Sequence, residues 1–188
     1  MNSRLKKLTF TALFAAINYV AFAYGKINIT IATGGSTAIH IANAVVVLSA
    51  WLLGPVYGGI AGAIGLSIAD VLDPRYITTA PKTFILKLCI GLIAGFTARK
   101  MKLEEKTEKK DIIKTTFISA IMALGFNVIA EPVVGYFYKR YLLHMNAEAS
   151  AIFATWSGGI TALNAVICTI IAVLLYLSLH KSFKTITN

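Results

Sequence analysis

The feature that most constrains the fold of this chain is a series of long apolar segments. Six segments consist mainly of apolar residues, at about 8–24, 39–53, 56–69, 82–98, 112–138 and 151–179. The chain of 188 residues is 57% hydrophobic and only 14% charged, with a mean hydropathy of +0.72. A soluble domain of this length does not need so much apolar sequence, whereas crossing a hydrocarbon core about 30 Å thick does. We therefore predict an all-α integral membrane protein, a single domain over residues 1–188 with six transmembrane helices.

The basic residues predict the orientation of these helices. Twelve of the 18 lysines and arginines fall in three clusters, at 4–7, 99–114 and 181–184. An even number of crossings puts all three clusters on one side, which the positive-inside rule identifies as the cytoplasm. Both termini are therefore expected in the cytoplasm. The net charge of +10 follows this membrane pattern, so we expect no nucleic-acid partner.

Motifs of well-known enzyme classes do not occur in the sequence. It contains no Gly-x-Ser-x-Gly, no His-Glu-x-x-His and no Gly-rich phosphate loop ending in Lys-Ser or Lys-Thr. Cys89 and Cys168 both fall in apolar helices, without the spacing of a metal or disulfide site. We expect neither enzymatic activity nor a metal or other cofactor, and we assign both cysteines to packing.

Small residues recur along several of the apolar segments. Glycines are frequent over 54–65, and Gly91 and Gly95 form a pair in the fourth helix. Such residues let helices approach closely, so we assign them to packing. Ala12 and Ala16 form a similar pair in the first helix, which fits either internal packing or the docking of another helix.

Residues 25–38 are too polar and glycine-rich to span a membrane. Ile27, Ile29 and Ile31 alternate with polar neighbours, which predicts a short extended segment, and Gly34-Gly35 then breaks it. The topology puts this segment outside the cell. We expect it either to close over a site as a lid or to serve as a plain connector.

One lysine, Lys87, lies inside the fourth apolar helix. It is six residues into that helix, or about 9 Å below the surface at a rise of 1.5 Å per residue. Insertion scales put the cost of such a lysine at roughly 2.5–3.5 kcal/mol, unless it faces protein, water or a ligand. Its function depends on what compensates for this cost.

Polar residues from other helices reach a similar depth. Counting from the helix ends puts Asn127 and Trp156 roughly 8 Å below the outer surface, close to the depth of Lys87. A lysine, amides, a carboxylate and a tryptophan suit a small, flat, polar ring compound. The indole can stack on the ring while the polar groups fix its heteroatoms. The candidate substrate-binding residues are Lys87, Asn127, Glu131, Trp156, His40, Asn43, Asn164 and Tyr136.

An ion pair between Lys87 and Glu131 is the structural alternative to a binding site. It would hold the fourth and fifth helices together without any ligand. The two interpretations are compatible, because a binding site can use the same pair.

Four stretches of the chain together match a known pattern: Ala12-x-x-x-Ala16, GGSTAIHIANA at 34–44, LLGPVYGGIAGAIGLSIAD at 52–70 and APKTFILKLCIGLIAG at 80–95. With these stretches the chain resembles the substrate-binding S components of energy-coupling-factor (ECF) vitamin transporters. The resemblance implies a six-helix subunit of the bacterial plasma membrane that binds a vitamin near its outer face, under the first loop. It also implies that Ala12 and Ala16 dock on a transmembrane T component, which two cytoplasmic ATPases drive. Partner ATPases would explain the missing ATP motif.

Within this family, the chain is most similar to the subgroup assigned to hydroxymethylpyrimidine, pyridoxine or riboflavin. That subgroup commonly carries an aspartate near position 43, where this chain has Asn43. The compact polar layer favours hydroxymethylpyrimidine or pyridoxine over the larger flavin. A riboflavin-binding S component, a self-sufficient carrier or channel, and a structural membrane protein are the alternatives.

Overall fold

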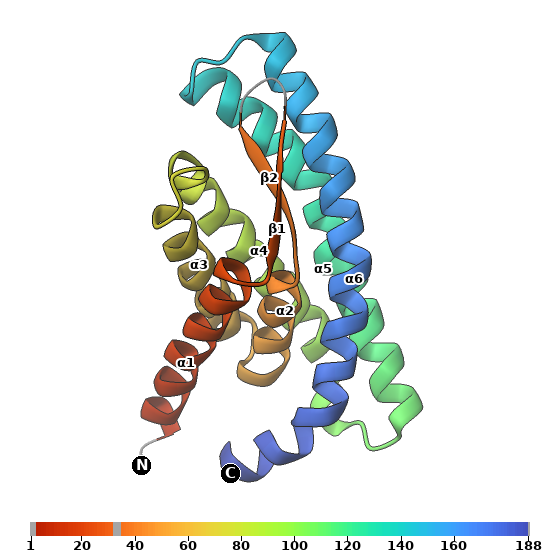
Figure 1. Ribbon diagram of the computed structural model, residues 1–188. Helices are drawn as coiled ribbons and strands as arrows, with labels where there is room; N and C mark the ends of the chain where they lie inside the picture. Colours follow the sequence, from red (N-terminus) through yellow and green to blue (C-terminus); the bar gives the residue numbers. More distant parts are fainter. Residues whose placement is uncertain (1–2, 32–34, 188) are drawn as a thin grey trace.

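Six α-helices and one β-hairpin make up the computed structural model, which describes residues 3–31 and 35–187 (Figure 1). The helices are α1 (Ser3–Ala23), α2 (Ala42–Leu53), α3 (Pro55–Val71), α4 (Ala80–Lys100), α5 (Lys109–Phe137) and α6 (Ala147–Thr187). The strands are β1 (Lys26–Thr30) and β2 (Ser36–His40). Short helical turns, η1 (Ile77–Thr79), η2 (Leu103–Glu105) and η3 (Tyr138–Leu142), join or extend the helices. The predicted all-α membrane fold with six helices is confirmed.

The helices differ in how they relate to a bilayer. Four helical stretches, Arg4–Ala23, Ile77–Lys100, Lys109–Leu142 and Ala147–Phe183, are long and apolar enough to cross one. With 12 residues, α2 extends only about 18 Å, less than the thickness of a hydrocarbon core. Eleven of its residues are buried, because α1, α3, α4 and α6 all contact it. This short helix is therefore the centre of the bundle, enclosed by protein rather than by lipid.

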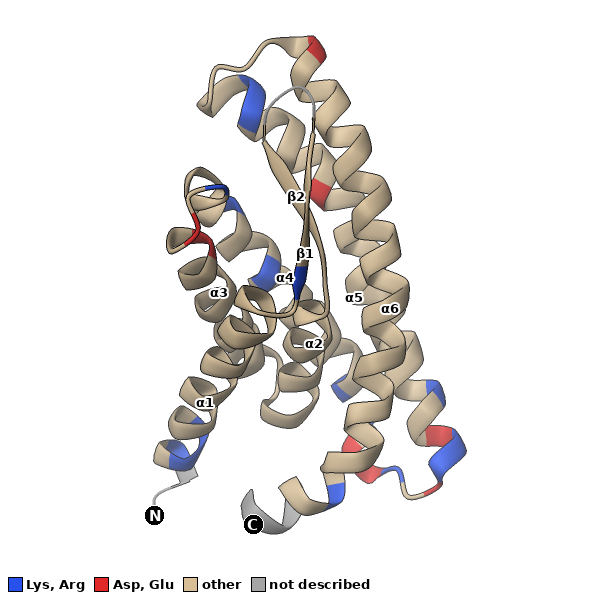
Figure 2. Cartoon of the chain, in the orientation of Figure 1, with Lys and Arg blue, Asp and Glu red and all other residues tan. Residues whose placement is uncertain are grey.

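The two ends of the chain lie at the same end of the molecule (Figure 1). Lysines and arginines gather there too, at the start of α1, in the loop between α4 and α5, and towards the end of α6 (Figure 2). This arrangement is the one expected if that end faces the cytoplasm. The side of the membrane on which the termini lie stays a prediction.

Glycines allow the backbones of α2, α3 and α4 to touch. A Cβ added at Gly58 would lie 2.3 Å from Cα of Ala50, and one added at Gly91 would lie 2.3 Å from Cα of Gly59. No side chain fits at these crossings. The structure thus confirms that the small residues of these helices serve close packing.

The predicted extended segment is confirmed, and it forms a hairpin rather than a lone strand. β1 and β2 pair antiparallel, with Lys26 opposite His40 and Thr30 opposite Ser36. The expectation that the second helix begins at about Ile39 is wrong, because Ile39 and His40 complete β2 and the helix begins at Ala42. Gly35 has a φ of +101°, the left-handed conformation that glycine adopts without strain. Gly34 lies outside the described residues.

Candidate functional site

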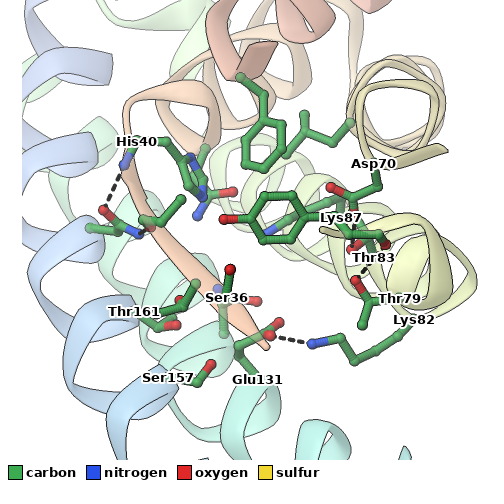
Figure 3. A pocket seen from close by; sticks show the side chains of 18 of the residues that line it. Ser36, His40, Asp70, Thr79, Lys82, Thr83, Lys87, Glu131, Ser157 and Thr161 are labelled. Carbon is green, nitrogen blue, oxygen red and sulfur yellow. Dashed lines mark hydrogen bonds and ion pairs between the residues drawn. The ribbon is translucent and has the colours of Figure 1, made fainter. Parts of the chain in front are cut away.

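A polar cavity of about 80 Å³ lies beneath the hairpin, between β2 and the helices (Figure 3). The hairpin and all six helices contribute to its wall, α1 through Phe22 and α2 through Asn43. It brings together six of the eight candidates chosen from the sequence: His40, Asn43, Lys87, Asn127, Glu131 and Asn164. Estimating depth by counting residues therefore located a cluster of polar side chains that the fold brings together.

Two of the sequence candidates lie elsewhere. Trp156 is 57% exposed and does not line the cavity. On α6 the cavity-facing positions are Phe153, Ser157, Thr161 and Asn164, and residue 156 is rotated about 100° from its neighbour at 157. Tyr136 lines a separate groove on the α5–α6 surface. The expectation that Trp156 provides a stacking surface within the polar layer is therefore wrong.

Other aromatic side chains supply what Trp156 does not. Phe22, Tyr76 and Phe153 line the cavity and are buried. Sequence reasoning missed all three, although extending the helical period backwards from Asn164 would have reached Phe153. Phe22 and Tyr76 face the cavity because α1 and the loop before α4 both end beside the hairpin, a juxtaposition that no local pattern indicates.

The ion pair in the cavity wall joins Glu131 to Lys82, not to Lys87. Lys82 is in the first turn of α4, and α5 runs antiparallel to α4, so Lys82 and Glu131 lie at the same height. The alternative of a Lys87–Glu131 pair is therefore wrong. The helices are still joined by a buried ion pair, as that alternative supposed, but with a different lysine.

Lys87 has no comparable partner. Its side chain is 7% exposed and forms no hydrogen bond or ion pair with any residue that the structure describes. One turn earlier on α4, the Thr83 hydroxyl donates to Oδ2 of Asp70 at 2.6 Å. Asp70 also lines the cavity, although it is not among the candidates predicted from the sequence. A buried, unpaired ammonium of this kind needs a compensating acceptor, which a bound molecule can supply.

Three polar atoms in the same wall also lack partners. Nδ1 of His40, Oδ1 of Asn43 and Oδ1 of Asn127 are buried without a hydrogen bond in the described structure. Leaving a buried polar group unpaired costs about 1–3 kcal/mol. The cavity thus offers an incoming molecule one strong donor, Lys87, two amide oxygens as acceptors, and an imidazole nitrogen that donates or accepts according to its tautomer. Among the described residues, no group of three or more His, Cys, Asp or Glu side chains is placed to hold a metal ion.

Asn164 has a different role from the other asparagines. Its Nδ2 donates to the Ala38 carbonyl at 2.9 Å, and its Oδ1 accepts from the His40 N–H at 3.0 Å. The Cys168 thiol donates to the His40 carbonyl at 3.4 Å. These bonds fasten β2 to α6, so the Asn164 amide is already occupied.

The other strand is fastened to the loop between α3 and α4. Nζ of Lys26 lies 2.8 Å from Oδ2 of Asp73 and 4.2 and 4.7 Å from the ring centroids of Phe22 and Tyr76. Hydrogen bonds from Arg75 and Lys26 hold the pKa of Asp73 well below its usual value. Burial raises the pKa of Tyr76 to about 12, which keeps its hydroxyl protonated. The hairpin is therefore held at both edges and covers the cavity.

Comparisons with known proteins agree with this architecture. The profile of the family described as "ECF-type riboflavin transporter, S component" matches residues 2–181. No curated protein matches the chain by sequence.

Two solved structures share the fold. One, described as the S component of a bacterial ECF transporter, is 18% identical, with a TM-score of 0.60, and the match covers 96% of this chain and 99% of that one. The other, the S component for biotin from an ECF-type ABC transporter, is 22% identical, with a TM-score of 0.63 and coverage of 93% and 92%. The profile match over nearly its whole length shows that the chain belongs to the ECF-type riboflavin transporter S component family, whose members are multi-pass membrane subunits for vitamin transport and not enzymes.

Proposed function

We propose that this chain captures hydroxymethylpyrimidine or pyridoxine in the cavity beneath the hairpin and presents it for import. The observation that carries the proposal is that one unpaired buried lysine, two unpaired amide oxygens and one unpaired imidazole nitrogen line the same cavity, which is the size of a few water molecules. A small nitrogen heterocycle that bears an amine or hydroxyl groups has both the acceptors and the donors that these groups lack.

Binding would use each part of the wall differently. Lys87 would donate to a ring nitrogen or oxygen, while Asn43 and Asn127 would accept from an amine or hydroxyl. Phe22 and Tyr76 would supply apolar and aromatic contact to the ring. The Lys82–Glu131 pair is already satisfied and would help to hold α4 and α5 in place.

Riboflavin is the second candidate, and the family match over residues 2–181 favours it. Its three fused rings and polyol chain need more room than the present cavity of about 80 Å³. Binding riboflavin would therefore require the hairpin to move away from α6 or from the α3–α4 loop. Hydroxymethylpyrimidine or pyridoxine would need a smaller change.

The partners would be a transmembrane T component and two cytoplasmic ATPases. Ala12 and Ala16 are exposed on α1, beside the exposed apolar side chains of Leu13 and Ile17. This smooth apolar face is open to another helix in the bilayer. A self-sufficient carrier would not need such a face, so copurification with the T component and ATPases separates the two functions.

Titration of the purified protein with hydroxymethylpyrimidine, pyridoxine and riboflavin tests the substrate proposal. We expect one of the two small vitamins to bind more tightly than riboflavin. Tighter binding of riboflavin would replace the first candidate with the second. Failure of all three to bind would overturn the proposed function.

A further inference from the structure

The backbone edge of β2 that faces α6 is only half paired. The N–H of Ile31 donates to the Gly35 carbonyl at 3.1 Å, which fixes the hydrogen-bonded positions of the hairpin. In an antiparallel pair these positions alternate, so Ser36, Ala38 and His40 direct their N–H and C=O groups away from β1. That edge of β2 meets α6, as the bonds from Asn164 show.

One repeat of this edge, meaning a C=O group and the N–H group two residues later, is occupied by a side-chain amide. Asn164 bonds the Ala38 carbonyl and the His40 N–H together, as a neighbouring strand would. The preceding repeat consists of the Ser36 carbonyl and the Ala38 N–H, with the same order of acceptor and donor. Within the described structure neither group has a hydrogen-bond partner, although Ala38 is only 5% exposed. An empty place for an amide-like group therefore lies directly beside the filled one.

Two hydroxyls of α6 flank the cavity next to this empty repeat. Ser157 and Thr161 are 3% and 7% exposed, and neither hydroxyl forms a hydrogen bond with a described residue. Elsewhere on α6, the hydroxyls of Thr155, Thr169 and Ser178 donate to the carbonyl four residues earlier, at 3.0, 2.7 and 3.0 Å. Ser36, Ser157 and Thr161 lie around one open space in Figure 3. The hydroxyls on the cavity side thus remain available, unlike those that bond their own helix.

We propose that this free repeat of β2, together with Ser157 and Thr161, recognises an amide-like edge of the substrate. Such an edge has a hydrogen-bond donor and an acceptor side by side, as in the amine and adjacent ring nitrogen of an aminopyrimidine or the imide of a flavin. It would bond to Ser36 and Ala38 as Asn164 bonds to Ala38 and His40. The inference rests on the proposed function and narrows it, because pyridoxine lacks an edge of this kind.

Paired probes test the inference. The first pair is hydroxymethylpyrimidine and its analogue without the ring amine, and the second is riboflavin and its derivative methylated on the imide nitrogen. The preferred vitamin of the two should lose affinity when its edge is altered. In the parent, the ratio of the dissociation constants of the altered and the unaltered probe measures this loss. The ratio should be roughly three- to tenfold smaller in Ala38→Pro, which removes the N–H, and in Thr161→Val, which removes the hydroxyl.

Matched controls exist for both variants. Thr30→Pro removes an N–H from the outward edge of β1, at an exposed position where proline is tolerated. Thr155→Val removes a hydroxyl from the exposed face of α6. Neither control should change the difference in affinity between the two probes of a pair. If Ala38→Pro does not fold, the affinities of the parent for the paired probes still test the amide-like edge, and Thr161→Val tests the hydroxyl of α6 beside it.

Two kinds of result have separate meanings. A parent protein that prefers pyridoxine, or variants in which the paired probes differ as much as in the parent, would overturn the role of the β2 edge and leave the proposed function standing. A parent protein that binds none of the vitamins would overturn both.

Discussion

Lys82 and Lys87 lie five residues apart on α4 and are equally buried, each 7% exposed, yet they have opposite surroundings. Lys82 is paired with Glu131, while Lys87 has no ion-pair partner in the described structure. Burial therefore does not separate a charge that the fold has paired from one that it has left unpaired. What separates them is whether the folded protein already compensates for the charge.

The largest effect is expected from breaking the pair. Lys82→Met leaves the Glu131 carboxylate buried without its counter-ion, which should lower the free energy of unfolding by about 3–5 kcal/mol. Lys87→Met, the matched change on the same helix, should not lower it. Thermal unfolding in detergent measures both. The double variant Lys82→Met/Glu131→Gln should recover most of the loss, and failure to do so would mean that the pair is not the cause.

A second contrast concerns two buried asparagines. Asn127 has an unpaired oxygen facing the cavity, so Asn127→Leu should stabilise the empty protein by about 1 kcal/mol and weaken vitamin binding. Asn164→Leu should instead destabilise it, by roughly 1–3 kcal/mol for each β2 group left unpaired. Unfolding and binding measured on both variants give the comparison. Equal effects on stability would contradict the division between paired and unpaired groups.

Another paired lysine, Lys26, whose side chain is 6% exposed, tests the same principle outside the membrane spans. Its partner Asp73 has a lowered pKa, so the stabilisation from the Lys26–Asp73 ion pair, the latch of the hairpin, is complete above the carboxyl's unfolded pKa of about 3.9. It is lost only as the pH falls towards the lowered value. Vitamin dissociation should therefore be constant from about pH 8 to 5 and accelerate below about pH 4.

Asp73→Asn isolates this latch. The variant should release vitamin faster than the parent at neutral pH and show a smaller further acceleration in acid. Stopped-flow dissociation rates measure both effects. A parent whose release already accelerates between pH 7 and 5 would show that another group controls the hairpin.

The smallest effect on binding is expected at α1. Ala12 and Ala16 lie on the exposed face, away from the cavity lining. Ala16→Trp should leave the vitamin dissociation constant of the isolated protein unchanged while preventing assembly with the T component and ATPases. Uptake and copurification measure the second effect. Normal uptake by this variant would exclude the face from docking.

The sequence predicted those parts of the molecule that follow from regular periodicity. The long apolar segments located six helices, and the regular helix rise placed Lys87, Asn127 and Trp156 at similar depths. It failed where the direction of a side chain decides the outcome. Depth alone does not distinguish Trp156 from Ser157, although about 100° of helix rotation puts one outside the cavity and the other inside.

The pairing of the charges was also beyond sequence reasoning. Lys82 and Lys87 both lie near the start of α4, so the sequence does not tell which of them meets Glu131 on α5. The register between α4 and α5 selects Lys82. Similarly, the alternation of Ile27, Ile29 and Ile31 indicated an extended segment, but its partner strand β2 was not predicted, and the last two residues of that strand were assigned to a helix. Contacts between distant segments set both outcomes, and a single sequence does not contain them as a local pattern.

The central claim is that Lys87 is held unpaired for a ligand, and a single variant tests it most directly. Lys87→Met removes the charge but keeps an unbranched apolar side chain, and Lys100→Met, at the exposed end of α4, is the control. The measurement is the dissociation constant of the vitamin that the parent binds most tightly, together with the melting temperature without vitamin. We predict affinity ten- to a hundredfold weaker, from the loss of about 1.5–3 kcal/mol of a charge-assisted hydrogen bond, with no fall in melting temperature. Unchanged affinity with a lowered melting temperature would contradict the account and make Lys87 a structural residue.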